Sequence, residues 1–301
     1  MHVDSQIENA DKEKTATAAL YTGFVDVAIT FVAFIAANSS VLLADFLKTT
    51  LEAFAVLLSW LSLRRIIYGK NHEFNYGIGK LESLSSVFVC VLMLIAVFII
   101  LGNAIRHIMY PSHISGIGLY IGIGAQIVFG VINTFLALKA RHLAQASRSP
   151  IALAQQQLFI SRTFGNIFIL LSISLSYFLQ DVSWSVYIDP IASIVIAGFI
   201  VLVASGVFTA SINDLLDKTL DEEYQMIILQ ELVAHYNDYE HLHGIRSRRS
   251  GSHAFIDIFL GFDPDKKVGD VERLMVTLRK TIERRIANSS VVISMSNEPV
   301  K

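Results

Sequence analysis

Six apolar runs, each long enough to cross a lipid bilayer, occupy the first two thirds of this sequence. They are Ala18–Ala37, Val41–Leu63, Leu84–Ile105, Gly116–Leu138, Ala152–Leu179 and Trp184–Thr209. A transmembrane helix needs about 20 such residues to cross about 30 Å of hydrocarbon. Only 17% of all residues are charged, against about 25% in soluble proteins. The sequence therefore predicts an integral, multi-pass membrane protein with an all-α six-helix bundle in the lipid bilayer.

Basic residues in the short connections predict how the helices are oriented, because such residues gather on the cytoplasmic side. Those between the second and third runs, and between the fourth and fifth, are Arg64, Arg65, Lys70, Lys80, Lys139, Arg141 and Arg148. Only Arg106 lies between the third and fourth runs. Both termini are therefore predicted to be cytoplasmic. The acidic, polar start of the chain lacks the basic region of a cleavable signal peptide.

The long apolar runs end at Thr209. From Asp214 to Lys301, charged residues occur throughout the sequence. We predict three parts: a cytoplasmic N-terminal segment at 1–14, a transmembrane domain at 15–213 and a small cytoplasmic domain at 214–301. Hydrophobic periodicity predicts the order of elements in the last part. They are a helix at Glu222–His235, a strand near His243–Arg248, a strand at Ala254–Phe262, a helix at Val268–Ile286 and a short strand at Val291–Ser294. This order is that of a compact α+β unit.

Charged residues inside the apolar runs are the strongest functional signal. Lys48 and Glu52 lie one helical turn apart in the second run, and Arg162 interrupts the fifth. Such a charge costs about 2.5–3.5 kcal/mol on insertion scales, so it normally faces a bundle interior with a partner. Asp45 shares a helix face with Lys48. Asp26 in the first run is a further candidate partner for Lys48 or Arg162.

The sequence offers little support for an enzyme or a nucleic-acid-binding protein. No nucleophile–base pairing or metal-hydrolase spacing stands out, and Gly77–Lys80 lacks the surrounding residues of a phosphate-binding loop. The net charge of −2 lacks the basic footprint of a nucleic-acid-binding protein. We expect neither an enzyme nor a nucleic-acid partner. Gly118 and Gly122 form a helix close-packing signal, and Asp189 before Pro190 is expected to cap the sixth helix.

Five segments carry a resemblance to a known family. Asn71–Leu84 (NHEFNYGIGKLESL) resembles the cytoplasmic loop signature of the cation diffusion facilitator family, which exports divalent metals across membranes. The segments similar to other parts of this family are Ser40–Asp45 (second helix), Ile188–Ala192 (sixth helix), Leu215–Lys218 (domain junction) and Leu242–Gly251 (first strand of the cytoplasmic domain). The resemblance runs from about Ala18 to Pro299, in the family's order.

The resemblance implies an architecture and a mechanism. It implies six transmembrane helices in a cation efflux domain, a ferredoxin-like cytoplasmic dimerisation domain, a homodimer, and metal-for-proton exchange by alternating access. A bacterial inner (plasma) membrane is the expected location. Lys80 and Asp217 match the family's charge interlock between the membrane domain and the cytoplasmic domain.

The family's transport site is a cage of Asp or His residues, two on helix two and two on helix five, spaced so that each pair projects from one helix face. The matching positions here are Lys48, Glu52, Leu158 and Arg162. A shifted register in helix five would offer Gln157 and Ser161, which are poor metal ligands. Two unit charges about 4 Å apart interact by about 4 kcal/mol at an effective dielectric of 20. Lys48 and Arg162 would therefore repel Zn²⁺.

At several accessory metal-binding positions of the family, this sequence has no metal-ligating residue. The loop keeps His72 but has Tyr76 where many members have histidine. The cytoplasmic domain keeps His243 but has Phe259 and Ser294 at histidine positions. Glu52 and His243 are the remaining candidate metal ligands. No resident cofactor is expected, and zinc or a similar divalent metal enters only as a substrate.

Two function classes follow from these observations. The first is a cation efflux transporter that works by cation–proton antiport with an altered or lost metal site. The second is a non-transporting homologue that acts as a structural or regulatory dimer partner, either with itself or in a heterodimer with an active homologue.

Overall fold

A computed structural model describes residues 2–68, 79–111, 117–147, 150–251 and 253–299. The chain divides into two compact units. The first comprises Met1–Leu63 and Phe88–Gly206, and the second comprises Arg64–Val87 and Val207–Lys301. The second unit thus contains the first residues of α3 and the last residues of α6 together with the C-terminal sheet.

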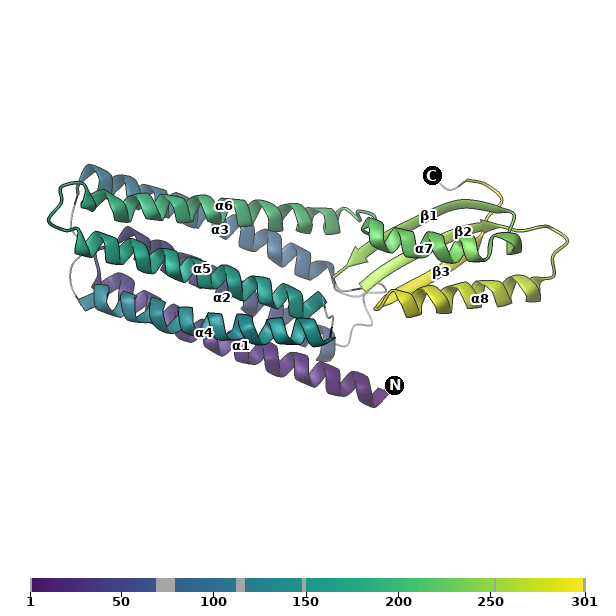
Figure 1. Cartoon of the computed structure of the whole chain (residues 1–301). Helices are drawn as coiled ribbons and strands as arrows, with labels where there is room; N and C mark the ends of the chain where they lie inside the picture. The colour runs from purple at the N-terminus through teal and green to yellow at the C-terminus, as the bar shows by residue number, and fades with distance from the viewer. Residues whose placement is uncertain (1, 69–78, 112–116, 148–149, 252, 300–301) are drawn as a thin grey trace. The chain divides into compact units, whose positions relative to one another are not determined.

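Six long helices form most of the chain up to residue 215 (Figure 1). They are α1 (His2–Ala36), α2 (Ser40–Tyr68), α3 (Lys80–Met109), α4 (Ile117–Ser147), α5 (Pro150–Phe178) and α6 (Ile188–Leu215). Each helix covers one of the six apolar runs. α1 also continues through the polar residues 4–14, a stretch that contains no proline to interrupt it.

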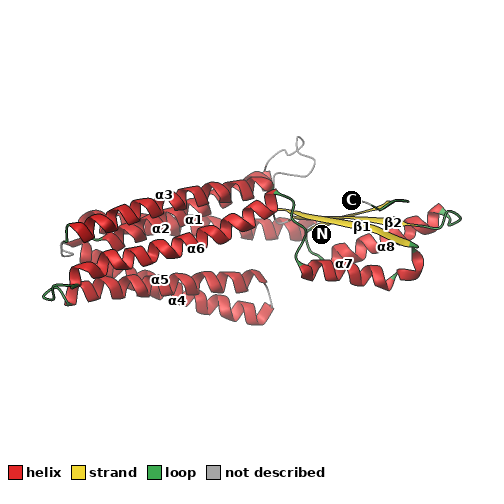
Figure 2. Cartoon of the chain, turned by 90° about the horizontal axis from the view of Figure 1, so that it is seen from above, coloured by secondary structure: helices red, strands yellow, loops and turns green. Residues whose placement is uncertain are grey.

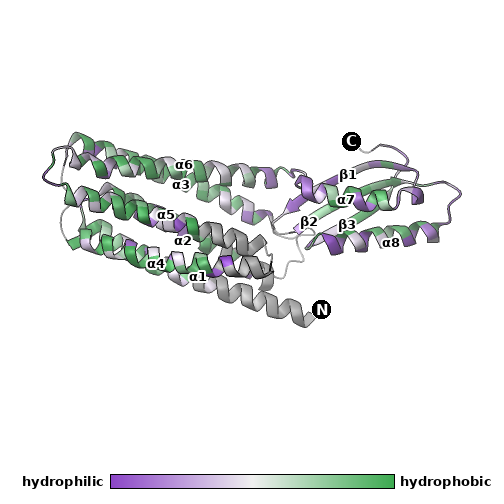
Figure 3. Ribbon diagram, viewed as in Figure 1, coloured by the Kyte–Doolittle hydropathy of each residue, from purple (hydrophilic) through white to green (hydrophobic). Residues whose placement is uncertain are grey.

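Within the part of the chain that the structure describes, four helical segments are apolar and long enough to cross a membrane. They are Lys80–Met109, Ile117–Lys139, Phe159–Phe178 and Ser185–Leu215, and Leu20–Ala36 is a shorter apolar segment. Hydrophobic colouring dominates α3 and α6 in Figure 3. α2 carries three charged residues within eight positions, Asp45, Lys48 and Glu52, which lower its hydropathy. Four of the six predicted spans are therefore supported by length and composition.

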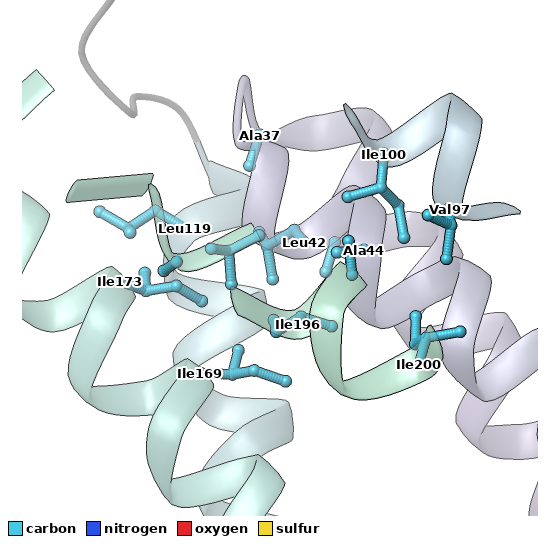
Figure 4. Close-up of a cluster of buried hydrophobic side chains, with 14 residues drawn as sticks. Ala37, Leu42, Ala44, Val97, Ile100, Leu119, Ile169, Ile173, Ile196 and Ile200 are labelled. Carbon is cyan, nitrogen blue, oxygen red and sulfur yellow. The ribbon is translucent and has the colours of Figure 1, made fainter. Parts of the chain in front are cut away.

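The core of the first unit draws side chains from all six helices (Figure 4). Its largest fully buried members include Leu42, Ile100, Leu119, Ile169 and Ile173. Small residues bring the helices close together. A Cβ atom on Gly118 would lie 2.3 Å from the backbone carbonyl carbon of Ala36. The close packing predicted for the Gly118 segment is confirmed, and it joins α4 to the end of α1.

The start of α2 is fixed by a carboxylate from α6. Asp189 accepts hydrogen bonds from the Ser39 hydroxyl and from the backbone N–H groups of Ser40 and Val41. These N–H groups lie at an N-terminus that has no intrahelical partners for them, and the helix dipole favours an anion there. Asp189 was expected to cap its own helix, but it caps α2 instead. These hydrogen bonds fix the N-terminus of α2, the helix that carries Lys48 and Glu52.

The second unit contains a three-stranded sheet with two helices. Its elements are α7 (Glu222–Ala234), β1 (His241–Ser250), β2 (His253–Gly261), α8 (Val268–Arg285) and β3 (Ser289–Met295). Short 3₁₀ helices lie at Ser185–Tyr187 in the first unit and at Tyr236–Asp238 here. β1 pairs antiparallel with β2, and β2 pairs parallel with β3. The predicted order of helix, strand, strand, helix and strand is confirmed.

Both helices pack on the same face of this sheet (Figure 2). Alternate residues of β2, such as Ile256 and Ile258, are fully buried. They form one core with Ile228 of α7 and with Leu278 and Ile282 of α8. Because side chains alternate along a strand, the other face of β2 carries Phe255, Asp257 and Phe259, which helices α7 and α8 do not cover.

Candidate functional site

Glu52 lies between two cations in the helix bundle. Its Oε2 atom is 2.9 Å from an Arg162 guanidinium nitrogen, and its Oε1 atom is 3.6 Å from Lys48 Nζ. The pair with Lys48 spans one turn of α2, whereas the pair with Arg162 joins α2 to α5. The three side chains are 16–30% exposed. One carboxylate therefore neutralises one cation and partly neutralises a second.

Lys48 also lies against α5. A Cβ atom added to Gly165 would be 3.3 Å from Lys48 Nζ. Gly165 is three residues beyond Arg162 in the sequence, about one helical turn. The absence of a side chain at this position leaves room for the ammonium group. Both cations therefore converge where α2 meets α5.

A second acid, Asp45, is held by an amide. Its side chain is 2% exposed, and its Oδ2 accepts a hydrogen bond of 2.5 Å from Gln126 Nε2 on α4. The side-chain amide oxygen of Gln126, Oε1, is buried with no hydrogen-bond partner in the described part of the chain. The same holds for Arg162 Nε and for Asn166 Nδ2. The region between α2, α4 and α5 is thus polar but incompletely paired.

Asp26 on α1 is the third acid of this region. It interacts electrostatically with Asp45, Glu52, Lys48 and Arg162. Its carboxylate forms no ion pair within 4 Å among the residues that the structure describes. The structure therefore brings the five predicted charged residues into one region and pairs them unequally.

The metal cage of the related family is not formed by the residues described. Leu158 belongs to α5, but its side chain lies outside the described residues. Where side chains are described, no group of three His, Cys, Asp or Glu residues could hold a metal ion. Glu52 is the one acid at the three described cage positions. A dication beside it would face both Lys48 and Arg162, with a repulsion of several kcal/mol from each at an effective dielectric of about 20.

Histidines in the C-terminal sheet are dispersed. The His243 ring packs on Gly261, where a Cβ atom would lie 2.8 Å from His243 Nε2. The rings of His241 and His243 are 5.9 Å apart. His253 Nε2 is 2.8 Å from the Ser290 hydroxyl. His72 and Tyr76 lie outside the described residues. Among the described residues, no histidine belongs to a group of three or more His, Cys, Asp or Glu side chains that could hold a metal ion.

A charge cluster in the second unit links the end of α6 to the start of α3. Lys80 Nζ is 2.9 Å from Asp217 Oδ1, and an Arg248 nitrogen is 3.6 Å from the same oxygen. Asp217 follows the last turn of α6 at a positive φ of 55°, a conformation that Asp tolerates better than most residues. The Arg248 guanidinium stacks over Phe255 at 5.2 Å. The sequence predicted Lys80 and Asp217 and missed Arg248.

The hydrogen bond from Lys80, together with the charges of Lys80 and Arg248, lowers the pKa of Asp217 below its ordinary value of 3.8. Because the folded-state pKa is lowered, the stabilisation is complete above the ordinary pKa and is lost as the pH falls through the lowered value. We expect Lys80→Gln to raise the Asp217 pKa toward 3.8, and Arg248→Gln to raise it less. A carboxyl carbon NMR titration of aspartate-labelled protein measures both. Equal shifts of the Asp217 pKa in the two variants would contradict the shorter distance of Asp217 to Lys80 than to Arg248.

Comparison with known proteins identifies the family. The sequence profile of the cation efflux transmembrane domain matches residues 16–216, and that of the cation efflux protein cytoplasmic domain matches residues 220–298. The chain therefore belongs to the cation efflux, or cation diffusion facilitator, family. Members of this family are membrane transporters and not enzymes.

Three relatives illustrate the range of similarity. The cation-efflux pump FieF of Shewanella oneidensis is 24% identical over 277 residues, which cover 92% of this chain and 90% of the pump. FieF of an Escherichia coli strain is 24% identical over 84% of this chain and 81% of its own. Protein p34 of Rickettsia rickettsii is 19% identical over 97% of this chain and 94% of its own.

Solved structures also match a part of this chain. The metal-bound C-terminal domain of the CzcD transporter from Thermotoga maritima is 23% identical, with a TM-score of 0.24. The match covers 26% of this chain and 93% of that domain.

Proposed function

We propose that this protein is a cation efflux transporter that exchanges a cation for protons through a site between α2 and α5. The observation that carries the proposal is the charged network of Lys48, Glu52 and Arg162 at the family's transport positions. Charges inside apolar helices are costly and mark ion or proton pathways.

The proposed site differs from the family's metal cage. Two cations beside one carboxylate oppose a divalent metal, so the transported cation is proposed to be held differently from zinc in a four-ligand cage. Glu52 is the residue around which the site would operate. During a transport cycle its carboxylate would leave Lys48 or Arg162 and later pair with them again, which couples ion entry to helix movement.

The remaining features of the proposal concern location and assembly. Six spans with both termini in the cytoplasm agree with the distribution of basic residues, and a ferredoxin-like cytoplasmic domain agrees with the matched profile. A bacterial inner membrane agrees with the FieF relatives from Shewanella and Escherichia. Pairing of two chains through the cytoplasmic domain completes the arrangement.

A second function is favoured by one specific observation. Glu52 is already paired with two cations, and no three-residue metal cluster exists among the described residues. A non-transporting homologue that pairs with itself or with an active relative would keep the scaffold and the Lys80–Asp217 contact while losing the metal cage.

Ion flux into proteoliposomes separates the two functions. We expect the native protein to move at least one of Mn²⁺, Fe²⁺, Co²⁺, Na⁺ or K⁺ against a proton gradient, and Glu52→Gln to abolish this flux. Asp181→Asn, at an exposed loop acid, is the matched control and should retain it. The transport proposal fails, and the partner function is favoured, if the native protein moves neither Zn²⁺ nor any of these ions while the variant with the rebuilt cage (Lys48→Asp, Leu158→His and Arg162→Asp) moves Zn²⁺.

The cytoplasmic domain is expected to assemble without metal. Its core of apolar side chains, including Ile256, Ile258 and Leu278, is closed by α7 and α8, and most family metal positions in it are replaced. We predict that residues 214–301 fold and dimerise in the presence of a chelator. Sedimentation velocity measures this directly. A monomer that dimerises only on addition of zinc would contradict the prediction.

A further inference from the structure

We propose that the outer face of α7 binds an amphipathic helix of another protein, a partner whose basic residues meet the acidic start of α7. The surface consists of Met226, Leu229 and Val233 of α7 and Tyr236 of the 3₁₀ turn that follows it, and we call it the outer stripe. The proposal goes beyond transport, because the outer stripe belongs to the second unit and contains no residue of the charged network in the helix bundle.

The outer stripe is apolar and open to solvent. Its four side chains are 41–69% exposed, whereas Ile228 and Leu232 on the opposite side of α7 are buried in the core of the sheet. Single exposed apolar side chains are ordinary, but a contiguous row of them marks an interaction site. α7 therefore has two apolar faces, and the residues that the structure describes cover only one of them.

The spacing of the outer stripe is that of a seam between helices. Its members follow one another at intervals of three, four and three residues, which is the a/d repeat by which two α-helices pack side by side. The stripe covers about 15 Å of helix, nearly three turns. The exposed apolar residues of α8, Val268 and Val276, are separated by charged residues and do not share a helix face. The outer stripe of α7 is therefore suited to a helix as its partner.

Acidic residues mark the start of α7. Asp221, Glu222 and Glu223 follow one another, and Glu222 continues the outer stripe one turn before Met226. None of the ion pairs between described residues involves these three acids. Carboxylates in a first turn stabilise the helix dipole, and here they also leave one end of the outer stripe negatively charged. The complementary partner helix therefore carries Lys or Arg beside its apolar stripe.

The same charges argue against two other occupants. A second copy of α7 packed in parallel would set Glu222 against Glu222, and like charges across a helix seam are unfavourable. An antiparallel copy would bring the acidic start to the end that carries Asp238 and Glu240, where Lys266 supplies a single positive charge. An anionic lipid surface attracts basic segments rather than acidic ones. A basic helix of another protein avoids all three conflicts.

Fluorescence anisotropy with a labelled model helix tests the proposal. The probe is a three-heptad synthetic peptide with Leu at its a and d positions and Lys at its e and g positions, and a counterpart peptide has Glu at e and g. The protein is the full chain in phosphatidylcholine nanodiscs, and empty nanodiscs measure binding to lipid. We expect the Lys peptide to bind with a dissociation constant of about 10 μM or tighter, and the Glu peptide to bind at least about tenfold more weakly.

Variants of exposed residues locate the binding. Leu229→Asp with Val233→Asp puts charges into the outer stripe and should weaken binding of the Lys peptide by at least about tenfold. Leu229→Gln with Val233→Thr covers the case that the first pair does not fold, and it should weaken binding as well. Glu222→Gln with Glu223→Gln should weaken binding and reduce its dependence on salt. Val276→Asp, at a position of α8 with the same 41% exposure as Leu229, is the matched control and should bind like the native chain.

The opposite outcomes contradict the proposal. No binding by the native chain, or unchanged binding after both sets of changes at Leu229 and Val233, would mean that the outer stripe is not a helix-binding site. Equal binding of the two peptides would refute recognition by the acids, and equal binding to empty nanodiscs would assign the peptide to lipid. Self-association of the native chain that is lost with the Leu229 and Val233 changes would mean that a second copy occupies the stripe.

Discussion

Removal of both Asp26 and Glu52, as Asp26→Asn with Glu52→Gln, is expected to cost about 3–5 kcal/mol of unfolding free energy, because it leaves Lys48 and Arg162 without a free acid. Glu52→Gln alone should cost less, about 1–3 kcal/mol, since Asp26 can then pair with Arg162 and both partners are partly exposed. Reversible unfolding in detergent or bicelles measures these free energies.

A double-mutant cycle completes this prediction. Arg162→Gln combined with Glu52→Gln should cost less than the sum of the two single changes, because the paired charges leave together. The coupling expected for side chains in contact is about 0.5–3 kcal/mol. Asp181→Asn, at an exposed position, should change the free energy by less than about 0.5 kcal/mol. Additive effects for Glu52 and Arg162 would mean that their 2.9 Å contact contributes nothing.

Restoration of the family's cage is expected to create zinc binding where the native protein has none. Lys48→Asp, Leu158→His and Arg162→Asp would leave, together with Glu52, two ligands on α2 and two on α5, each pair one turn apart. Three acids and one histidine are suitable ligands for Zn²⁺. The expected change is from no measurable binding to a dissociation constant of about 1 μM or tighter, which calorimetry measures.

The control for the rebuilt site is the same triple variant with Glu52→Gln added. It should lose most of the binding, because one of four ligands becomes a weaker one. A folded triple variant that binds no zinc would mean that the helix-five ligands do not lie at Leu158 and Arg162. The shifted register, in which Gln157 and Ser161 occupy the ligand positions of helix five, would then be tested with the corresponding substitutions.

Local sequence patterns were sufficient for most of the fold. The six apolar runs each became a helix, because long uninterrupted apolar stretches have few alternatives at this length. In the C-terminal part, the alternation of Ala254–Phe262 predicted β2 to within one residue at each end. The predicted helix at Val268–Ile286 corresponds to α8, whose apolar stripe contains Leu278 and Ile282.

Contacts distant in sequence were predicted less well. Asp189 caps α2 across 149 residues of sequence, whereas local reasoning assigned it to its own helix. Gln126 as the partner of Asp45 gave no signal, since a lone glutamine in an apolar helix has many roles. Arg248 was missed because three arginines lie within four residues of β1 and only the fold shows which one reaches Asp217.

The candidate site could be predicted from the sequence only in part. The spacing of Lys48 and Glu52 on one helix face predicted that they could pair, because residues four apart are neighbours. The scarcity of charges in apolar helices identified Arg162 as a further partner. Neither argument predicted that Glu52 would bridge both cations, or that Asp26 would remain unpaired, since both facts depend on how α1, α2 and α5 pack.

We propose that a network of Lys48, Glu52 and Arg162 replaces a metal cage in the native protein. Equilibrium dialysis of the purified, chelator-stripped full chain against ⁶⁵Zn²⁺ tests it most directly. We expect no stoichiometric binding at micromolar zinc, with or without Glu52→Ala. Binding of one zinc per chain in the native protein that is lost in Glu52→Ala would contradict it.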